Sequence, residues 1–217
     1  MSETSDLGAI TPQAIDISSR SRSIAKEIVG DTGYHDLIRQ RCVIATGDPE
    51  FASLLRFVND PVRAGIDAIR RKSAVYTDIR MISAGISKIG HECPITCVLD
   101  LAAGKDFVDR YGVTRTSAGF MALGCDLDGS IIVIGNAPSA ALTLYKLIEE
   151  GASPALVIGT PVGFVNAAES KELLHSLDVP SITCIGTRGG TAVAVACVNE
   201  LIAITAQEVG DGKGDTD

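Results

Sequence analysis

The sequence predicts a three-layer α/β/α domain in which a parallel β-sheet carries helices on both faces. Three stretches in the second half each contain a short apolar strand, a glycine-containing loop and a helix. They are "SIIVIGNAP" with the helix after it, "ALVIGTPVGFVN" with "AAESKELL", and "SITCIGTRGG" with "TAVAVACVNELIAI". Consecutive units of this kind form parallel sheets, because the helix carries the chain back across one face of the sheet before the next strand begins.

The composition fits one globular domain with an aliphatic core. The chain has 217 residues, of which 46% are hydrophobic, 21% are charged and only 4% are aromatic, with no tryptophan. We expect a single domain over residues 14–209, a flexible segment at 1–13 and a disordered Gly/Asp-rich tail at 210–217. The formal net charge of −8 argues against nucleic acid or an anionic membrane as a general partner.

The cysteines and the hydropathy indicate a cytoplasmic protein. No CxxC pair is present, and several cysteines lie in apolar stretches, so we expect reduced thiols, no disulfide and no metal site. The six are Cys42, Cys93, Cys97, Cys125, Cys184 and Cys197. No apolar run reaches roughly 18 residues and the polar N-terminus is unlike a signal peptide, so no membrane association is expected.

The first half supplies further elements in order. A polar helix is predicted at Ala14–Val29, and a second helix at Tyr34–Ala45 ends before Gly47. "NDPVRAGIDAIRRK" predicts a helix with Asp60 as N-cap, Pro61 at its first position and basic residues in its last turn. Two strand candidates follow, at residues 73–79 and 93–99.

The second-half units place their loops at one edge of the sheet. Pro138 suits the first turn of a helix whose apolar face ends before Gly151. In such folds ligands bind beyond the carboxyl ends of the strands, where "IGNAP", "IGTPVGF" and "IGTRGG" meet. Gly186, Gly189 and Gly190 have two open interpretations: tight packing of a helix on its strand, or close backbone approach to an anionic ligand.

The individual motifs and side chains say less about the function than the fold pattern says about the architecture. The sequence has no phosphate-binding P-loop and no G-x-S-x-G nucleophile elbow. His35, His91 and His175 are scattered, and His175 is best explained by its place near a helix end. Arg115 in "GVTRTSAGF" stands among hydroxyl residues where a helix should begin, which suits carboxylate or phosphate binding. These features alone predict an enzyme or binding protein for a small anionic ligand.

The motifs taken together resemble those of the precorrin-8X methylmutases of cobalamin synthesis. The resemblance rests on "TDIRMISAGI", "GVTRTSAG", "GNAPSA", "GTPVGFVNAAESK" and the glycine pair of the last helix, in order from about Ala14 to Ile204. It implies a flavodoxin-like fold with a five-stranded parallel sheet, in a homodimer whose site lies near the subunit interface. It also implies an isomerase that moves a methyl group from C-11 to C-12 of precorrin-8X or its cobalt counterpart, without a cofactor.

By the same resemblance, particular residues are expected to bind the corrinoid. The substrate carries many carboxylates, so an acidic protein needs locally placed donors. The residues matched to substrate binding are Ser23, Arg115, Thr116, Asn136, Pro138, Gly163, Gly189 and Gly190.

Two departures from the family pattern concern mechanism. The family usually has a histidine that transfers a proton before the "TGD" turn, whereas this chain has Ile44, which cannot do so. His35 lies nine residues earlier and should face the opposite side of the helix. Asp48, Thr46 or another polar group of the pocket could replace the acid. The family's "GRxGG" arginine is also displaced, with Thr187 in its place and Arg188 one position later.

Three functions therefore remain open at the level of sequence. A concerted methyl shift needs no nucleophile, and an acid contributes typically ~10²–10⁴-fold, so an isomerase without the histidine is feasible. A non-catalytic corrinoid carrier that has lost the acid is the main alternative. An unrelated flavodoxin-like nucleotide binder is the third.

Overall fold

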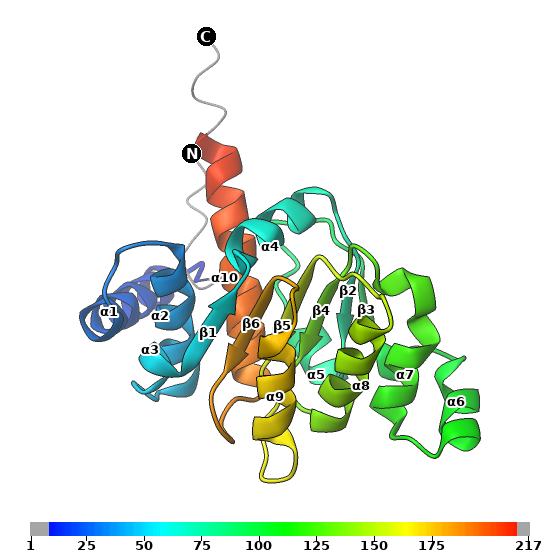
Figure 1. The fold of residues 1–217 in the computed structure, drawn as a ribbon. Helices are drawn as coiled ribbons and strands as arrows, with labels where there is room; N and C mark the ends of the chain where they lie inside the picture. The colour runs from blue at the N-terminus through cyan, green and yellow to red at the C-terminus, as the bar shows by residue number, and fades with distance from the viewer. Residues whose placement is uncertain (1–8, 212–217) are drawn as a thin grey trace.

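A computed structural model describes residues 9–211, which form a six-stranded sheet between two layers of helices (Figure 1). The strand order is β1-β6-β5-β4-β2-β3, and all neighbours except β1 and β6 are parallel. The strands are β1 (Leu55–Val58), β2 (Val75–Thr77), β3 (Ile95–Cys97), β4 (Ile131–Ile134), β5 (Leu156–Gly159) and β6 (Ser181–Cys184). The α/β class and the layered arrangement expected from the sequence are confirmed.

The sixth strand corrects the expectation of a five-stranded, wholly parallel sheet. β1 pairs antiparallel with β6, so that Leu55 faces Cys184 and Val58 faces Ser181. The sequence "FASLLRFV" gave no separate strand signal, because β1 follows the four-residue helix α3 (Phe51–Leu54) without a turn. β1 is only half-buried, as expected for an edge strand.

Alternating side chains of the central strands supply two hydrophobic cores. In β4, Ile131 and Val133 belong to one core, whereas Ile132 and Ile134 belong to the other. This alternation follows from the two-residue period of a strand. Because both faces are covered, β4 and β5 are continuously apolar, which is how the sequence revealed them.

The helices divide between these two cores. The first core is covered by α1 (Pro12–Val29), α2 (Tyr34–Thr46), α4 (Pro61–Arg70), α5 (Arg80–Gly85) and α10 (Thr191–Asp211). The second is covered by α7 (Arg115–Leu123), α8 (Pro138–Glu149) and α9 (Ala167–Ser176), with α6 (Gly104–Tyr111) packed outside α7. Asp60 caps α4 as expected, accepting from the Arg63 N–H at 3.4 Å.

The chain ends of the domain differ slightly from the expected bounds. α1 begins at Pro12, two residues before the predicted start, with the Thr11 hydroxyl accepting from the Ala14 N–H. α10 reaches Asp211, inside the predicted tail. The rest of the expected terminal segments, residues 1–8 and 212–217, lies outside the described residues.

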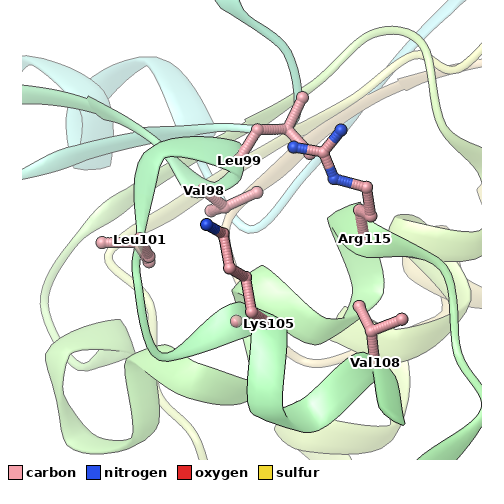
Figure 2. Close-up of a pocket in the computed structure, with 7 residues that line it drawn as sticks. Val98, Leu99, Leu101, Lys105, Val108 and Arg115 are labelled. Atoms are coloured by element: carbon pink, nitrogen blue, oxygen red, sulfur yellow. The ribbon is translucent and has the colours of Figure 1, made fainter.

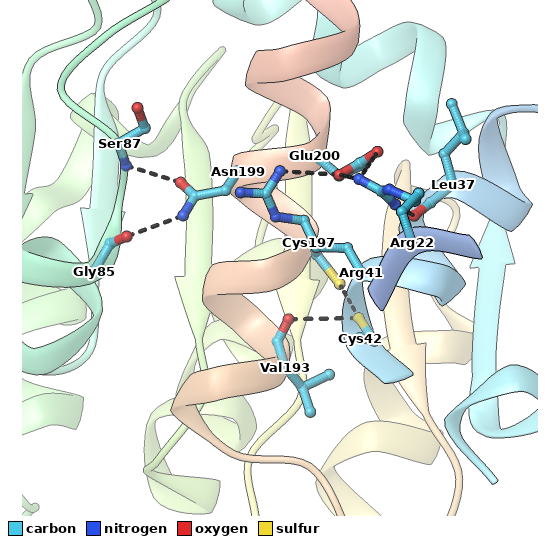
Figure 3. Close-up of polar contacts among 10 residues, drawn as sticks. All are labelled: Arg22, Leu37, Arg41, Cys42, Gly85, Ser87, Val193, Cys197, Asn199 and Glu200. Carbon is cyan, nitrogen blue, oxygen red and sulfur yellow. Dashed lines mark hydrogen bonds and ion pairs between the residues drawn. The ribbon is translucent and has the colours of Figure 1, made fainter. Parts of the chain in front are cut away.

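α10 is the central helix of the first core. Its Glu200 carboxylate accepts hydrogen bonds from Arg22 of α1 and Arg41 of α2, which fixes both helices against it (Figure 3). By length and composition, Thr191–Val209 could cross a membrane. The length of unbroken apolar runs in the sequence did not indicate this segment. Just over half of this segment is buried inside the fold, as in the core helix of a soluble protein.

Candidate functional site

The loops after β5 and β6 are joined to each other at the carboxyl edge of the sheet. The Gly190 N–H donates to the Thr160 carbonyl at 2.7 Å, and the Gly163 N–H donates to the Thr187 carbonyl at 3.0 Å. At Gly189, with φ +148°, a Cβ would overlap the Thr160 carbonyl oxygen. The structure thus gives Gly189 a packing role between two loops, in addition to the ligand contact that the resemblance implies.

A buried lysine donates a hydrogen bond to the second of these loops. Lys171 of α9 is fully buried, and its ammonium group donates to the Arg188 carbonyl. The Cys184 sulfur lies 3.6 Å from the Lys171 Nζ. Burial lowers the pKa of Lys171, with the neighbouring Cys184 opposing that shift. "ESK" gave no signal for this role, because the bond joins residues 17 positions apart.

A buried aspartate holds the neighbouring loop after β4. Asp78, directly after β2, is fully buried and accepts from three backbone N–H groups, those of Gly135, Asn136 and Ala137, at 3.3, 2.8 and 2.8 Å. Burial raises the pKa of the Asp78 carboxyl, and the three hydrogen bonds oppose that rise. The side chain of Asn136 is left exposed at the edge. Asp78 lies within "TDIRM", but nothing in that local pattern indicates its contacts with a loop more than 50 positions away.

Arg115 stands at the first turn of α7, as predicted. Thr114 caps the helix, accepting from the Ser117 N–H at 3.2 Å, and its hydroxyl lies 2.9 Å from the hydroxyl of Ser139 on α8. This contact places Arg115 next to the loop that carries Asn136. Arg115 is exposed, and no ion pair joins it to another of the described residues.

Two further predicted residues have supporting positions near Arg115. Thr116 is buried, and its hydroxyl lies 3.1 Å from that of Thr114. Pro138 occupies the first turn of α8, as the sequence indicated. These two residues fix the starts of α7 and α8.

The end of α2 reaches the same edge of the sheet. The Arg188 guanidinium donates to Asp48 at 2.9 Å and also pairs with Glu50, which joins the turn after α2 to the loop after β6. Ile44 is half-buried and packs against the first core. The Thr46 hydroxyl donates to the Cys42 carbonyl at 2.8 Å. The Asp48 carboxylate therefore already serves as an acceptor for Arg188, and Thr46 is occupied as a helix-end donor.

His35, His175 and Ser23 lie elsewhere. His35 is at the opposite end of α2, stacked on Phe57 with ring centroids 4.2 Å apart. Burial and the adjacent Arg39 lower the pKa of His35. His175 stands in the last turn of α9, as the helix-end interpretation requires. Ser23 is exposed on α1, where its hydroxyl donates to the Ser19 carbonyl at 3.0 Å. Nothing in the described contacts joins Ser23 to the loops at the sheet edge.

Exposed apolar side chains gather at this edge, which sequence reasoning did not single out. Phe164 is 96% exposed and Val165 is 76% exposed, although both follow the buried strand β5. Val162 in the same loop and Ile185 after β6 are also exposed. We call these four residues the apolar edge. Exposed apolar side chains that group together are typical of binding surfaces, since their contact with water is unfavourable.

No group of three His, Cys, Asp or Glu side chains gathers to hold a metal within residues 9–211. The cysteines are free throughout the described chain, and Cys42 and Cys197 meet in the core with sulfurs 3.7 Å apart (Figure 3).

Comparison with known proteins decides which family has this arrangement. The family model described as precorrin-8X methylmutase matches residues 16–204. The chain belongs to the precorrin-8X methylmutase family. The resemblance seen in the motifs is thereby confirmed, and the family is one of isomerases that catalyse a methyl migration.

Individual relatives match most of the chain. The cobalt-precorrin-8 methylmutase of Methanocaldococcus jannaschii is 40% identical, over 93% of this chain and 99% of that protein. The precorrin-8X methylmutase of Pseudomonas aeruginosa is 38% identical over 74% of this chain and 80% of that protein. The solved structure of the Thermus thermophilus precorrin-8X methyl mutase superposes with a TM-score of 0.80 at 32% identity, covering 88% of this chain and 98% of that one. Methylmutases named for the cobalt-containing and the cobalt-free substrate are both similar to this chain.

Proposed function

We propose that this protein is an isomerase of cobalamin biosynthesis that moves the methyl group from C-11 to C-12 of precorrin-8X or cobalt-precorrin-8. The single observation that carries the proposal is the family match over residues 16–204, because it includes every loop of the site. The apolar edge suits the face of a flat macrocycle, and Arg115 and Asn136 suit its peripheral carboxylates.

The residues described above act mainly by positioning. A suprafacial 1,5-methyl shift breaks and forms carbon–carbon bonds in one step, so the protein need not supply a nucleophile. Loops held by Gly189, Lys171 and Asp78 would present a rigid surface on which the macrocycle adopts its reactive conformation. Arg115 would pair with a substrate carboxylate. No residue is assigned to proton transfer, since Ile44 stands at the position of the family histidine.

We further propose that the protein works as a cytoplasmic homodimer. α1 presents an outward face with Ile17, Ile24 and Ile28, which are 41–60% exposed. Such a face on an amphipathic helix is suited to pairing with a second copy. Ser23 lies on this helix, so dimer formation would be the route by which it reaches a substrate. The net charge of −8 supports the absence of nucleic-acid and membrane partners.

The experiment that tests the function is incubation of the purified protein with precorrin-8X, followed by absorbance and mass spectrometry. An isomerase gives hydrogenobyrinate, with a changed spectrum at unchanged mass. The cobalt-containing substrate is assayed in parallel. Tight binding of both corrinoids with no conversion of either would contradict the isomerase proposal and would leave the carrier function in its place.

A further inference from the structure

A small cavity lies beside Arg115, outside the loops described so far. It has a volume of about 30 Å³ and opens between the short helix η2 (Val98–Asp100), α6 and α7. Its apolar lining comes from Val98, Leu99, Leu101 and Val108, and its two cationic residues are Lys105 and Arg115. Because η2 follows β3 and β3 is parallel to β2, the cavity belongs to the same carboxyl edge as the rest of the site.

Two glycines fix the helices that carry the cations. A Cβ on Gly119 would lie 2.6 Å from the Val98 carbonyl oxygen, and one on Gly104 would lie 3.4 Å from the Gly119 Cα. α7 therefore packs closely on η2, and α6 packs closely on α7. Arg115 is one helical turn before Gly119, and Lys105 is next to Gly104, so both side chains project from a tightly packed base.

The two side chains extend toward the same wall of the cavity. Figure 2 shows the Lys105 ammonium group near Val98 and the Arg115 guanidinium near Leu99. Both cations thus stand over an apolar floor, on a protein whose net charge is −8. Like charges held on one small cavity repel each other unless an anion is placed between them.

Among the described residues, no carboxylate forms an ion pair with Lys105 or Arg115. Asp100, at the end of η2, is already paired with Arg80, whose Nε lies 2.8 Å from its carboxylate. Asp109 lies one turn along α6 from Lys105, yet the described ion pairs do not join the two. Neither cation is therefore engaged by a described carboxylate, and both are available to an anionic ligand.

We propose that Lys105 and Arg115 together form a subsite for one carboxylate-bearing side chain of the corrinoid, an inference that rests on the function proposed above. About 10–15 Å³ holds one water-sized group, so the cavity of about 30 Å³ accommodates the two oxygens of a carboxylate. Val98 and Leu101 contact the methylene groups of that side chain. The contact between Thr114 and Ser139 connects the subsite to the Asn136 loop, so a carboxylate bound here sets the position of the ring over the apolar edge.

The test compares binding of two corrinoids to matched variants. Hydrogenobyrinate carries free carboxylates, and its fully amidated derivative has the same ring without the charges. Both are titrated into the wild type, Lys105→Met, Lys105→Arg and Lys146→Met, with circular dichroism to verify folding. Lys146 is an exposed lysine in the last turn of α8, at the far end of that helix from the site, and serves as the control.

We expect Lys105→Met to weaken hydrogenobyrinate binding by about three- to tenfold, as for loss of one charge-assisted hydrogen bond at a partly exposed site. Binding of the amide should be unchanged, Lys105→Arg should retain most of the affinity, and Lys146→Met should have no effect. Equal affinity of Lys105→Met and the wild type for hydrogenobyrinate would overturn the subsite, as would an equal loss for acid and amide. If the wild type binds neither corrinoid, the proposed function fails with it, and that result is distinct from the other two.

Discussion

The contact between the loops after β5 and β6 makes Gly189→Ala the most direct test of the site's architecture. Gly189 has φ +148°, and its Cβ would also lie 3.1 Å from the Thr160 carbonyl carbon and 3.2 Å from the Pro161 oxygen. These are backbone atoms, so they cannot turn away as the end of a flexible side chain can. The substitution must separate the two loops and break the 2.7 Å hydrogen bond from Gly190 to Thr160.

Two contributions determine the expected loss of stability. Backbone strain at such a φ costs about 1–3 kcal/mol. Breaking a buried hydrogen bond costs about 1–3 kcal/mol when the groups are left unpaired. We expect a total near 3 kcal/mol, which corresponds to a fall in Tm of about 6–12 °C for a domain of this size.

Gly186 of the same loop provides the matched control. It has φ +74°, and no atom lies within 4 Å of its Cβ position, so Gly186→Ala introduces strain without overlap. Its expected cost is about 1–2 kcal/mol. Urea and thermal unfolding by circular dichroism measure both variants. Equal losses for the two substitutions would refute the claim that close contact with Thr160 is what requires glycine at position 189.

Three other predictions follow from the site and the assembly. Ile44→His should raise the isomerase rate and add a pH dependence with an apparent pKa of roughly 6.5, while an unchanged pH–rate profile would direct attention to Asp48→Asn. Lys171→Met should lower the free energy of unfolding by about 1–3 kcal/mol, because the Arg188 carbonyl loses its donor. Since burial lowers the pKa of Lys171, the unfolded chain binds the proton more tightly, and wild-type stability should rise with pH from that lowered pKa to the ordinary value of 10.5. Urea unfolding at neutral and alkaline pH should therefore show the deficit of Lys171→Met growing with pH, and a constant deficit would contradict this. Light scattering should give twice the 22.6 kDa chain mass, whereas a monomer at micromolar concentration would contradict the homodimer.

Some features of this protein could be predicted from the sequence because their signals are local. The strands β4 and β5 are continuously apolar since both faces are covered, and the cap residue Asp60 acts on a group only three positions away. The motifs around Arg115, Asn136 and Gly163 are contiguous, so they identified the family and its reaction without coordinates.

Other features depend on residues that are far apart in the chain, and only the tertiary structure could decide them. Strand β1 follows α3 without a turn, so it gave no separate strand signal, and its place in the sheet is set by pairing with β6. Asp78 meets the "GNAP" loop 57 to 59 positions away, and Lys171 meets Arg188 across a strand. Lys105 is an ordinary surface lysine in sequence and lines the same cavity as Arg115 because Gly104 and Gly119 let α6 approach α7. A local pattern reports which face of an element is buried, whereas the groups that meet at a site are chosen by packing between elements.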